Sequence, residues 1–362
     1  MIRNRVLALA ALAALLALLA PAAARAQARV PAGFFGVMGD GPLLAPEIDL
    51  AGEARAMRGA GVGSIRAAFY WRDMQPQPGP VNFAETDRIV GAAAGARVRV
   101  LPVLVRAPAW AAGGDEREGA VPAADQYGAW VGEVVRRYGP SGSFWAENPA
   151  IPKVPVRQWQ VWNEPDITRY LTPPAGRSWP GAYVPLLRAG AAAIRRADRD
   201  ATVVAAGLTN KSWEDLGRLY RAGGRKHFDA AAIHPFSARV SNVVKIVRLA
   251  RRTMRRRGDG RKPLFLTEVS WSSGKGRSTF NYGWETTERG QAARLRQAFT
   301  ALARERRRLR IGGVWWYTWL SPALGDDESF SYGGLRRLEN GRPVDKPALA
   351  AFRSTVRRLR SR

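Results

Sequence analysis

The sequence predicts a (β/α)8 barrel that forms a single domain from residue 29 to residue 362. Short apolar segments of strand length alternate with longer helical segments along nearly the whole chain, which indicates parallel strands joined by helical crossovers. Eight such strand–helix units occur, the number that closes into a barrel. The competing fold is a doubly wound open sheet, but Phe34–Gly41 lacks the glycine-rich phosphate loop that usually follows the first strand of that fold.

The first 28 residues are predicted to be a signal peptide rather than part of the barrel. Arg3 and Arg5 precede an apolar run, Val6–Ala20, and Ala24-Arg25-Ala26 offers a cleavage site with small residues. The run of about 15 residues is shorter than the about 20 that a membrane-spanning helix needs. We therefore expect an exported protein, secreted, periplasmic or at the cell surface, without stable membrane insertion after the leader is removed. An uncleaved anchor is the alternative.

Each predicted strand is a short run rich in branched aliphatic, small or aromatic residues that ends near a polar residue, Gly or Pro. The predicted strands are Phe34–Met38, Ser64–Trp71, Arg97–Val105, Val156–Val161, Thr202–Leu208, Ala230–His234, Pro263–Glu268 and Ile311–Trp319.

Each predicted helix follows one of these strands and has apolar residues at helical spacing. Gly61 ends the first helix, and Pro347 begins the last one. The predicted helices are Asp49–Ala60, Ala84–Ala94, Asp125–Tyr138, Tyr183–Ala197, Trp213–Arg221, Val240–Arg257, Glu288–Arg308 and Pro347–Arg358.

The fourth strand carries the strongest functional signal. Its alternating pattern stops at Trp162-Asn163-Glu164-Pro165, and Pro165 has no N–H to continue a strand ladder. A carboxylate at the end of a buried strand is energetically costly, so Glu164 is a candidate catalytic residue. The seventh strand ends in the same way at Glu268. Hydrolysis of an acetal needs two carboxyl groups, and strands four and seven lie across a barrel mouth from one another.

Other polar or aromatic residues at the strand ends complete the predicted site. Arg66, on strand two, is expected to keep Glu268 ionised, whereas desolvation beside Trp162 is expected to raise the pKa of Glu164. Asn163 is placed to bind a sugar 2-hydroxyl. His234 ends strand six, either at the site or as a satisfied core histidine. The remaining predicted substrate-binding residues are Tyr282, Trp316 and Trp319.

At these residues the chain resembles the clan A glycoside hydrolases, most closely the family 39-type and family 5-type (cellulase-like) enzymes. The resemblance extends over nearly all of the mature chain and includes the Trp-Asn-Glu-Pro block and Thr267-Glu268. It implies a retaining enzyme with Glu164 as acid/base and Glu268 as nucleophile, their carboxyl groups about 5–5.5 Å apart. These families usually carry a tyrosine shortly after the strand-six histidine; Phe236 stands there, so Tyr282 or Tyr317 would have to supply the hydroxyl.

Composition narrows the possible partners. The formal net charge is +27, and 50 of the 57 basic residues are arginine. The densest basic runs lie at the ends of predicted outer helices without interleaved aromatic residues, so we expect no nucleic acid. With two histidines and no cysteine, we expect neither a metal nor a cofactor. The expected partner is a carbohydrate substrate, and acidic carbohydrates are among the candidates. The rival hypotheses are a non-catalytic carbohydrate-binding barrel and a cationic surface-binding protein.

Overall fold

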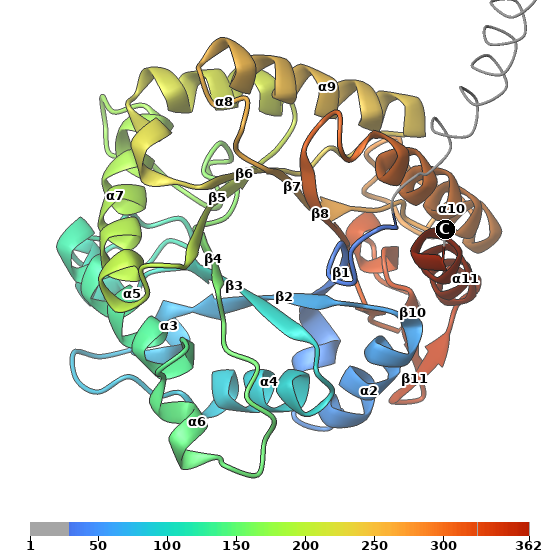
Figure 1. The fold of residues 1–362 in the computed structure, drawn as a ribbon, viewed down its shortest axis with the longest axis horizontal. Helices are drawn as coiled ribbons and strands as arrows, with labels where there is room; N and C mark the ends of the chain where they lie inside the picture. The colour runs from blue at the N-terminus through green and yellow to red at the C-terminus, as the bar shows by residue number, and fades with distance from the viewer. Residues whose placement is uncertain (1–28, 324, 362) are drawn as a thin grey trace, which may run out of the picture.

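The computed structural model describes residues 29–323 and 325–361, so the predicted leader lies outside the described residues. Eight parallel strands form a closed barrel, β1 to β8 in sequence order, with β8 beside β1 (Figure 1). The predicted (β/α)8 fold is confirmed. The barrel strands are β1 (Phe35–Gly39), β2 (Ser64–Tyr70), β3 (Arg99–Val105), β4 (Gln158–Val161), β5 (Thr202–Leu208), β6 (Ala230–Ile233), β7 (Leu264–Val269) and β8 (Ile311–Trp316).

The helices form an outer ring around the barrel (Figure 1). The eight predicted helices are α2 (Leu50–Ala60), α4 (Ala84–Gly95), α5 (Ala124–Tyr138), α7 (Trp179–Ala197), α8 (Ser212–Arg221), α9 (Val240–Arg256), α10 (Glu288–Glu305) and α11 (Pro347–Ser361). Their ends follow the sequence: Asp49 accepts a hydrogen bond from the Gly52 N–H at the start of α2, and Gly61 ends it in a left-handed conformation.

Shorter helical segments were not predicted. They are α3 (Trp71–Met74), α6 (Ser143–Glu147) and the 3₁₀ turns Gly41–Leu44, Ala109–Ala112, Gly224–His227 and Ser329–Tyr332. Across the described ranges, no helix is both long enough and apolar enough to cross a membrane.

The buried residues form two separate cores, one inside the barrel and one between the barrel and its helices. The two cores follow from strand geometry, because successive side chains of a strand point to opposite faces of the sheet. On β8, Trp315 packs inside the barrel against Phe265, whereas its neighbour Trp316 packs outside against Phe299 of α10.

A small sheet after β8 was also missed. It consists of β9 (Leu320–Ser321), β10 (Arg336–Glu339) and β11 (Arg342–Asp345). The sequence expectation extended the eighth strand to Trp319, but β8 ends at Trp316. Asn340 and Gly341 join β10 to β11 with φ of 50° and 73°, the conformation of a two-residue hairpin turn.

Candidate active site

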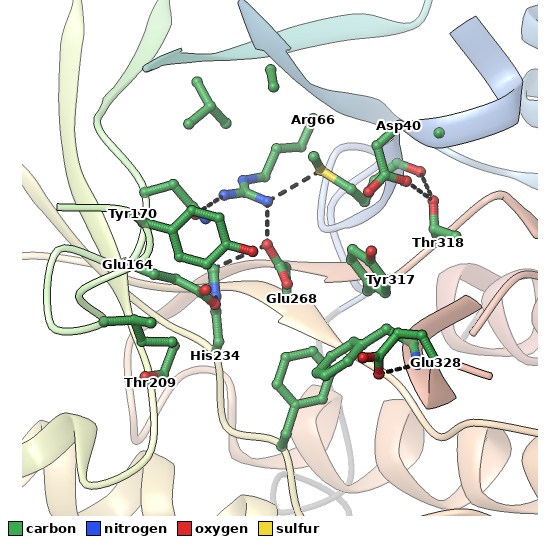
Figure 2. Close-up of a pocket in the computed structure, with 18 of the residues that line it drawn as sticks. Asp40, Arg66, Glu164, Tyr170, Thr209, His234, Glu268, Tyr317, Thr318 and Glu328 are labelled. Carbon is green, nitrogen blue, oxygen red and sulfur yellow. Dashed lines mark hydrogen bonds and ion pairs between the residues drawn. The ribbon is translucent and has the colours of Figure 1, made fainter. Parts of the chain in front are cut away.

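A cavity of about 770 Å³ opens where the strands end in loops, and it contains both candidate carboxylates (Figure 2). Residues at or just after the ends of all eight barrel strands contribute to its wall. This is the end of a (β/α)8 barrel at which active sites lie. The predicted residues among those lining the cavity are Arg66, Asn163, Glu164, His234, Glu268 and Tyr282.

The chain leaves β4 through a strained backbone that places Glu164 in the cavity. Trp162 and Glu164 have φ of 69° and 42°, in the left-handed region that non-glycine residues rarely adopt. Hydrogen bonds hold this conformation: the Trp162 N–H donates to the Leu104 carbonyl at 3.0 Å, and the Glu164 N–H donates to the Gly207 carbonyl at 3.1 Å. The neighbouring strands β3 and β5 thus fix the position of Glu164.

Arg66 forms hydrogen bonds with three neighbouring side chains at the site, and Figure 2 shows it beside Glu268. Its guanidinium is fully buried and donates to Gln160 Oε1 at 2.8 Å, to Glu268 Oε1 at 2.7 Å and to Asn163 Oδ1 at 2.6 Å. The predicted pairing of Arg66 with Glu268 is therefore present. Because the same guanidinium binds Asn163, it also fixes the amide beside Glu164.

His234 lies between the two carboxylates. A hydrogen bond of 2.5 Å joins its Nδ1 to Glu164 Oε1, and another of 2.9 Å joins its Nε2 to Thr267 Oγ1. Glu268 Oε1 lies 3.6 Å from Nε2. Burial lowers the pKa of His234 to about 4, so the imidazole is neutral near pH 7. Gly207 makes room for the ring, since a Cβ there would lie 2.1 Å from Nε2.

The two carboxyl groups differ in their electrostatic surroundings. Burial, together with the nearby Asp166 carboxylate, raises the pKa of Glu164 to about 8, so this group is largely protonated at neutral pH. Burial also raises the pKa of Glu268, while the contacting Arg66 acts in the opposite direction. The expectation that Arg66 favours the ionised form of Glu268 has the right sign, but burial outweighs it. The expected desolvation of Glu164 is present.

The same residues form the one group of at least three potential metal ligands within the described ranges. One donor atom each from Glu164, His234 and Glu268 lie within 4.8 Å of one another. However, the guanidinium of Arg66 already occupies Glu268 Oε1 and places a positive charge beside this group. Such a charge disfavours a metal ion there.

Two predicted residues lie outside the cavity. Trp316 is fully buried on the outer face of β8 and donates to the Gly333 carbonyl at 2.9 Å. Trp319 is also buried, and its indole N–H donates to Glu53 Oε2 at 2.7 Å. Strand alternation explains the error for Trp316, because Tyr317, one residue beyond it, is the side chain that lines the cavity. Trp319 lies beyond the end of β8, where this alternation no longer applies.

Three acidic or phenolic residues of the site were missed. Asp40 follows β1 and accepts a hydrogen bond from Thr318 Oγ1 at 2.7 Å; a polar residue just after a strand is the signal that also identified Glu164. Asp166 accepts hydrogen bonds from the backbone N–H and hydroxyl of Thr209. Tyr170 comes from the loop after β4 and lines the cavity, where Figure 2 shows it beside Glu164; burial, with the nearby Glu164 and Glu268 carboxylates, raises the pKa of its phenol. No sequence pattern relates that loop position to the strand ends.

Phe236 lines the cavity within a group of aromatic rings. Its ring lies 5.2 Å from that of Phe330 and 5.3 Å from that of Trp284, measured between centroids. Of the two tyrosines considered as replacements for a hydroxyl here, Tyr282 directs its hydroxyl to Glu328 at 3.3 Å. Burial, with the nearby Asp40 and Glu268 carboxylates, raises the pKa of Tyr317, which lines the cavity.

Known proteins resemble this chain in fold but not closely in sequence. No protein-family model matches the sequence, and no curated protein matches it. A family 39 glycoside hydrolase from Bacteroides cellulosilyticus superimposes with a TM-score of 0.64 at 19% identity, over 92% of this chain and 65% of that one. A monomeric beta-xylosidase from Caulobacter crescentus gives 0.63 at 17% identity, over 90% and 68%. A GH5_18 protein from Bifidobacterium longum subsp. infantis gives 0.62 at 15% identity, over 91% and 80%.

This chain therefore spans slightly less than two thirds of the first of these proteins. At such identities the likeness establishes the barrel fold. It also confirms the structural resemblance to family 39 and family 5 glycoside hydrolases that the sequence motifs indicated.

Proposed function

We propose that this protein is a retaining glycoside hydrolase that cleaves O-glycosidic bonds of a polysaccharide or glycoconjugate. The observation that carries the proposal is the pair of buried carboxyl groups in one cavity, with one oxygen of Glu164 and one of Glu268 within 4.8 Å. Retaining enzymes have carboxyl groups about 5–5.5 Å apart, whereas inverting enzymes leave about 6.5–9.5 Å for a water. The separation supports retention.

In the first step, Glu268 attacks the anomeric carbon and forms a glycosyl ester while the bond to the leaving oxygen breaks. Glu164 gives its proton to that oxygen, a role that suits a carboxyl group with a pKa of about 8. In the second step, water attacks the anomeric carbon, Glu164 takes up a proton from the water, and Glu268 leaves as a carboxylate. Both carboxyl groups thereby return to their starting states.

The other site residues support these steps. Arg66 favours the ionised form of Glu268 at 2.7 Å and orients Asn163 for a sugar 2-hydroxyl. Neutral His234 donates its Nδ1 proton to Glu164 Oε1, and its Nε2 accepts from Thr267, which leaves Glu164 Oε2 to carry the catalytic proton.

Hydrolysis of a panel of aryl glycosides and polysaccharides tests the proposal. The panel includes xylosides, because a solved structure of similar fold is a beta-xylosidase, and uronides, because the chain is basic. Proton NMR of the first product should show the anomeric configuration of the substrate. Initial inversion would contradict the double displacement, and absence of hydrolysis across the panel would favour the non-catalytic carbohydrate-binding barrel.

Two substitutions assign the carboxyl groups. Glu268→Gln should abolish turnover and leave glycan binding largely intact, since the amide keeps the shape and loses the nucleophile. Glu164→Gln should lower the hydrolysis of substrates with poor leaving groups by about 10²–10⁴, and far less for a dinitrophenyl glycoside, whose leaving group needs no proton. Full activity of either variant on a natural glycan would refute its role.

We also propose that the protein is exported by its predicted leader, residues 1–28. N-terminal sequencing of the protein recovered outside the cytoplasm should begin near residue 29. An intact leader on that material would indicate an anchor.

A further inference from the structure

Two large apolar side chains stand out because they remain exposed. Among the described residues, Phe280 and Tyr282 are the exposed large hydrophobic residues, with 65% and 58% of their surface accessible. They are two positions apart in the loop between β7 and α10, the loop that follows the strand of Glu268. Tyr282 lines the cavity. An exposed aromatic ring on the wall of a polar cavity, with a second exposed ring two positions away in the same loop, is typical of a ligand-binding surface.

The loop holds these two residues in fixed positions against the segment 327–329. The backbone N–H of Phe280 donates to the Asp327 carbonyl at 3.0 Å, and its carbonyl accepts from the Ser329 N–H at 3.2 Å. The N–H of Tyr282 donates to Glu285 Oε1 at 2.7 Å, and its hydroxyl donates to Glu328 Oε2 at 3.3 Å. A surface that is already ordered loses little conformational entropy when a ligand binds.

The cavity wall behind Tyr282 continues as aromatic rings toward the carboxylates. The Tyr282 ring lies 5.2 Å from that of Phe330, which in turn lies 5.7 Å from that of Tyr317. All three residues line the cavity. A series of aromatic rings therefore runs along the cavity wall from Tyr282 through Phe330 to Tyr317.

We propose that Phe280 and Tyr282 form a binding platform for sugar residues beyond the one held at Glu164 and Glu268, so that the substrate is an oligosaccharide or polysaccharide. The C–H-bearing face of a pyranose is apolar and matches an exposed aromatic ring, whereas its edge hydroxyls stay in water. Continuity with the cavity identifies the occupant as the same glycan chain. This inference rests on the proposed function, because it extends that site.

The experiment measures affinity against chain length. Full-length Glu268→Gln protein, which cannot cut the probes, is titrated calorimetrically with cello-, xylo- and manno-oligosaccharides from the disaccharide to the hexasaccharide. We expect affinity to rise with length for at least one series. Adding Phe280→Ala and Tyr282→Ala together should weaken binding of the longer members about tenfold or more, the effect of losing about one buried aromatic side chain, and should leave the disaccharide nearly unchanged.

Matched controls separate stacking from other causes. Tyr282→Phe keeps the ring and loses only the hydroxyl bond to Glu328, so it should retain most of the affinity for long oligosaccharides that the alanine pair loses. Three results would overturn the platform. The alanine pair could weaken binding equally for oligosaccharides of every length, or it could have no effect on binding. Alternatively, the affinity of the Glu268→Gln protein could fail to rise with oligosaccharide length in every series. The outcomes also separate the two proposals. If binding depends on oligosaccharide length and needs the two rings, while the wild type hydrolyses none of the substrates, the platform is supported and the hydrolase is refuted.

Discussion

Replacing Arg66 by Met should destabilise the protein in a pH-dependent manner. Arg66 is fully buried and its strongest partner is Glu268, at 2.7 Å. Met has a side chain of similar length to Arg but carries no charge. The substitution therefore leaves the Glu268 carboxylate buried without its ion-pair partner. Met preserves much of the apolar packing, so the lost charge interactions dominate the effect.

The magnitude follows from the contacts. Breaking a buried ion pair by removing one partner costs about 3–5 kcal/mol, which at about 2 °C per kcal/mol lowers Tm by roughly 6–10 °C. About 1.5–3 kcal/mol of this is the charge-assisted bond to Glu268, equivalent to roughly 1–2 pKa units. The folded-state pKa of Glu268 is already raised, and the variant should raise it further. A raised acid pKa gives stability that is present below the unfolded pKa and is lost as pH rises, so the destabilisation should grow from pH 4 to pH 7.5.

Calorimetric melting of wild type and variant at both pH values tests this reasoning. Arg251→Met is the matched control, because Arg251 is equally buried and donates to the neutral Leu309 and Lys262 carbonyls at 2.9 Å. Its pKa is lowered to about 10, so it stays charged throughout this range and its loss should destabilise equally at both pH values. If Arg66→Met lowers Tm by the same amount at pH 4 and pH 7.5, the ion pair does not contribute as described.

Other outcomes are expected at the same site. The kcat/KM of the wild type should fall as the pH rises past about 8, where Glu164 loses its proton. In Asp166→Asn this fall should begin at lower pH, because the negative charge of Asp166 no longer raises the pKa of Glu164. An unchanged alkaline limb in the variant would contradict the assignment of that limb to Glu164. Gly207→Ala should lower the free energy of unfolding by about 1–3 kcal/mol through contact with the His234 ring. Gly59→Ala, with nothing within 4 Å, should be neutral or stabilising in the same melts. Tyr170→Phe should lower kcat about tenfold with little change in stability, since its phenol lines the cavity that holds both carboxylates; unaltered kinetics would exclude a role in positioning them.

Most of the barrel was predictable because the spacing of apolar residues differs between strands and helices, and the chain alternates these two patterns in repeated strand–helix units. The third strand illustrates this: Arg97–Val105 was expected, and β3 spans Arg99–Val105. The small sheet was missed because its strands are short and partly exposed, although Asn340-Gly341 is a strong hairpin signal.

The site was predictable mainly where its residues lie at or near strand ends. Glu164, His234 and Glu268 come together because parallel strands bring their carboxyl ends to one edge. Arg66 was expected at the end of its strand, but it lies within β2, four residues before Tyr70, and reaches Glu268 from inside the barrel. Alternation does not reveal which face of β8 is inward, so Trp316 was chosen in place of Tyr317. Tyr170 reaches the cavity through a loop fixed by tertiary contacts, such as the bond of 2.9 Å from the Trp162 indole N–H to the Tyr170 carbonyl.

The backbone at the end of β4 has a consequence for the choice of residue at position 164. A left-handed conformation at Glu164 costs on the order of 1–3 kcal/mol for a residue with a side chain, and burial of its carboxyl adds to that cost. Glycine at this position would relieve the backbone strain and the cost of burying the carboxyl, but it would leave the buried Nδ1 of His234 without its hydrogen-bond partner. The fold alone therefore does not favour glutamate through its backbone conformation. A residue that breaks a local backbone rule in this way is expected at a functional site.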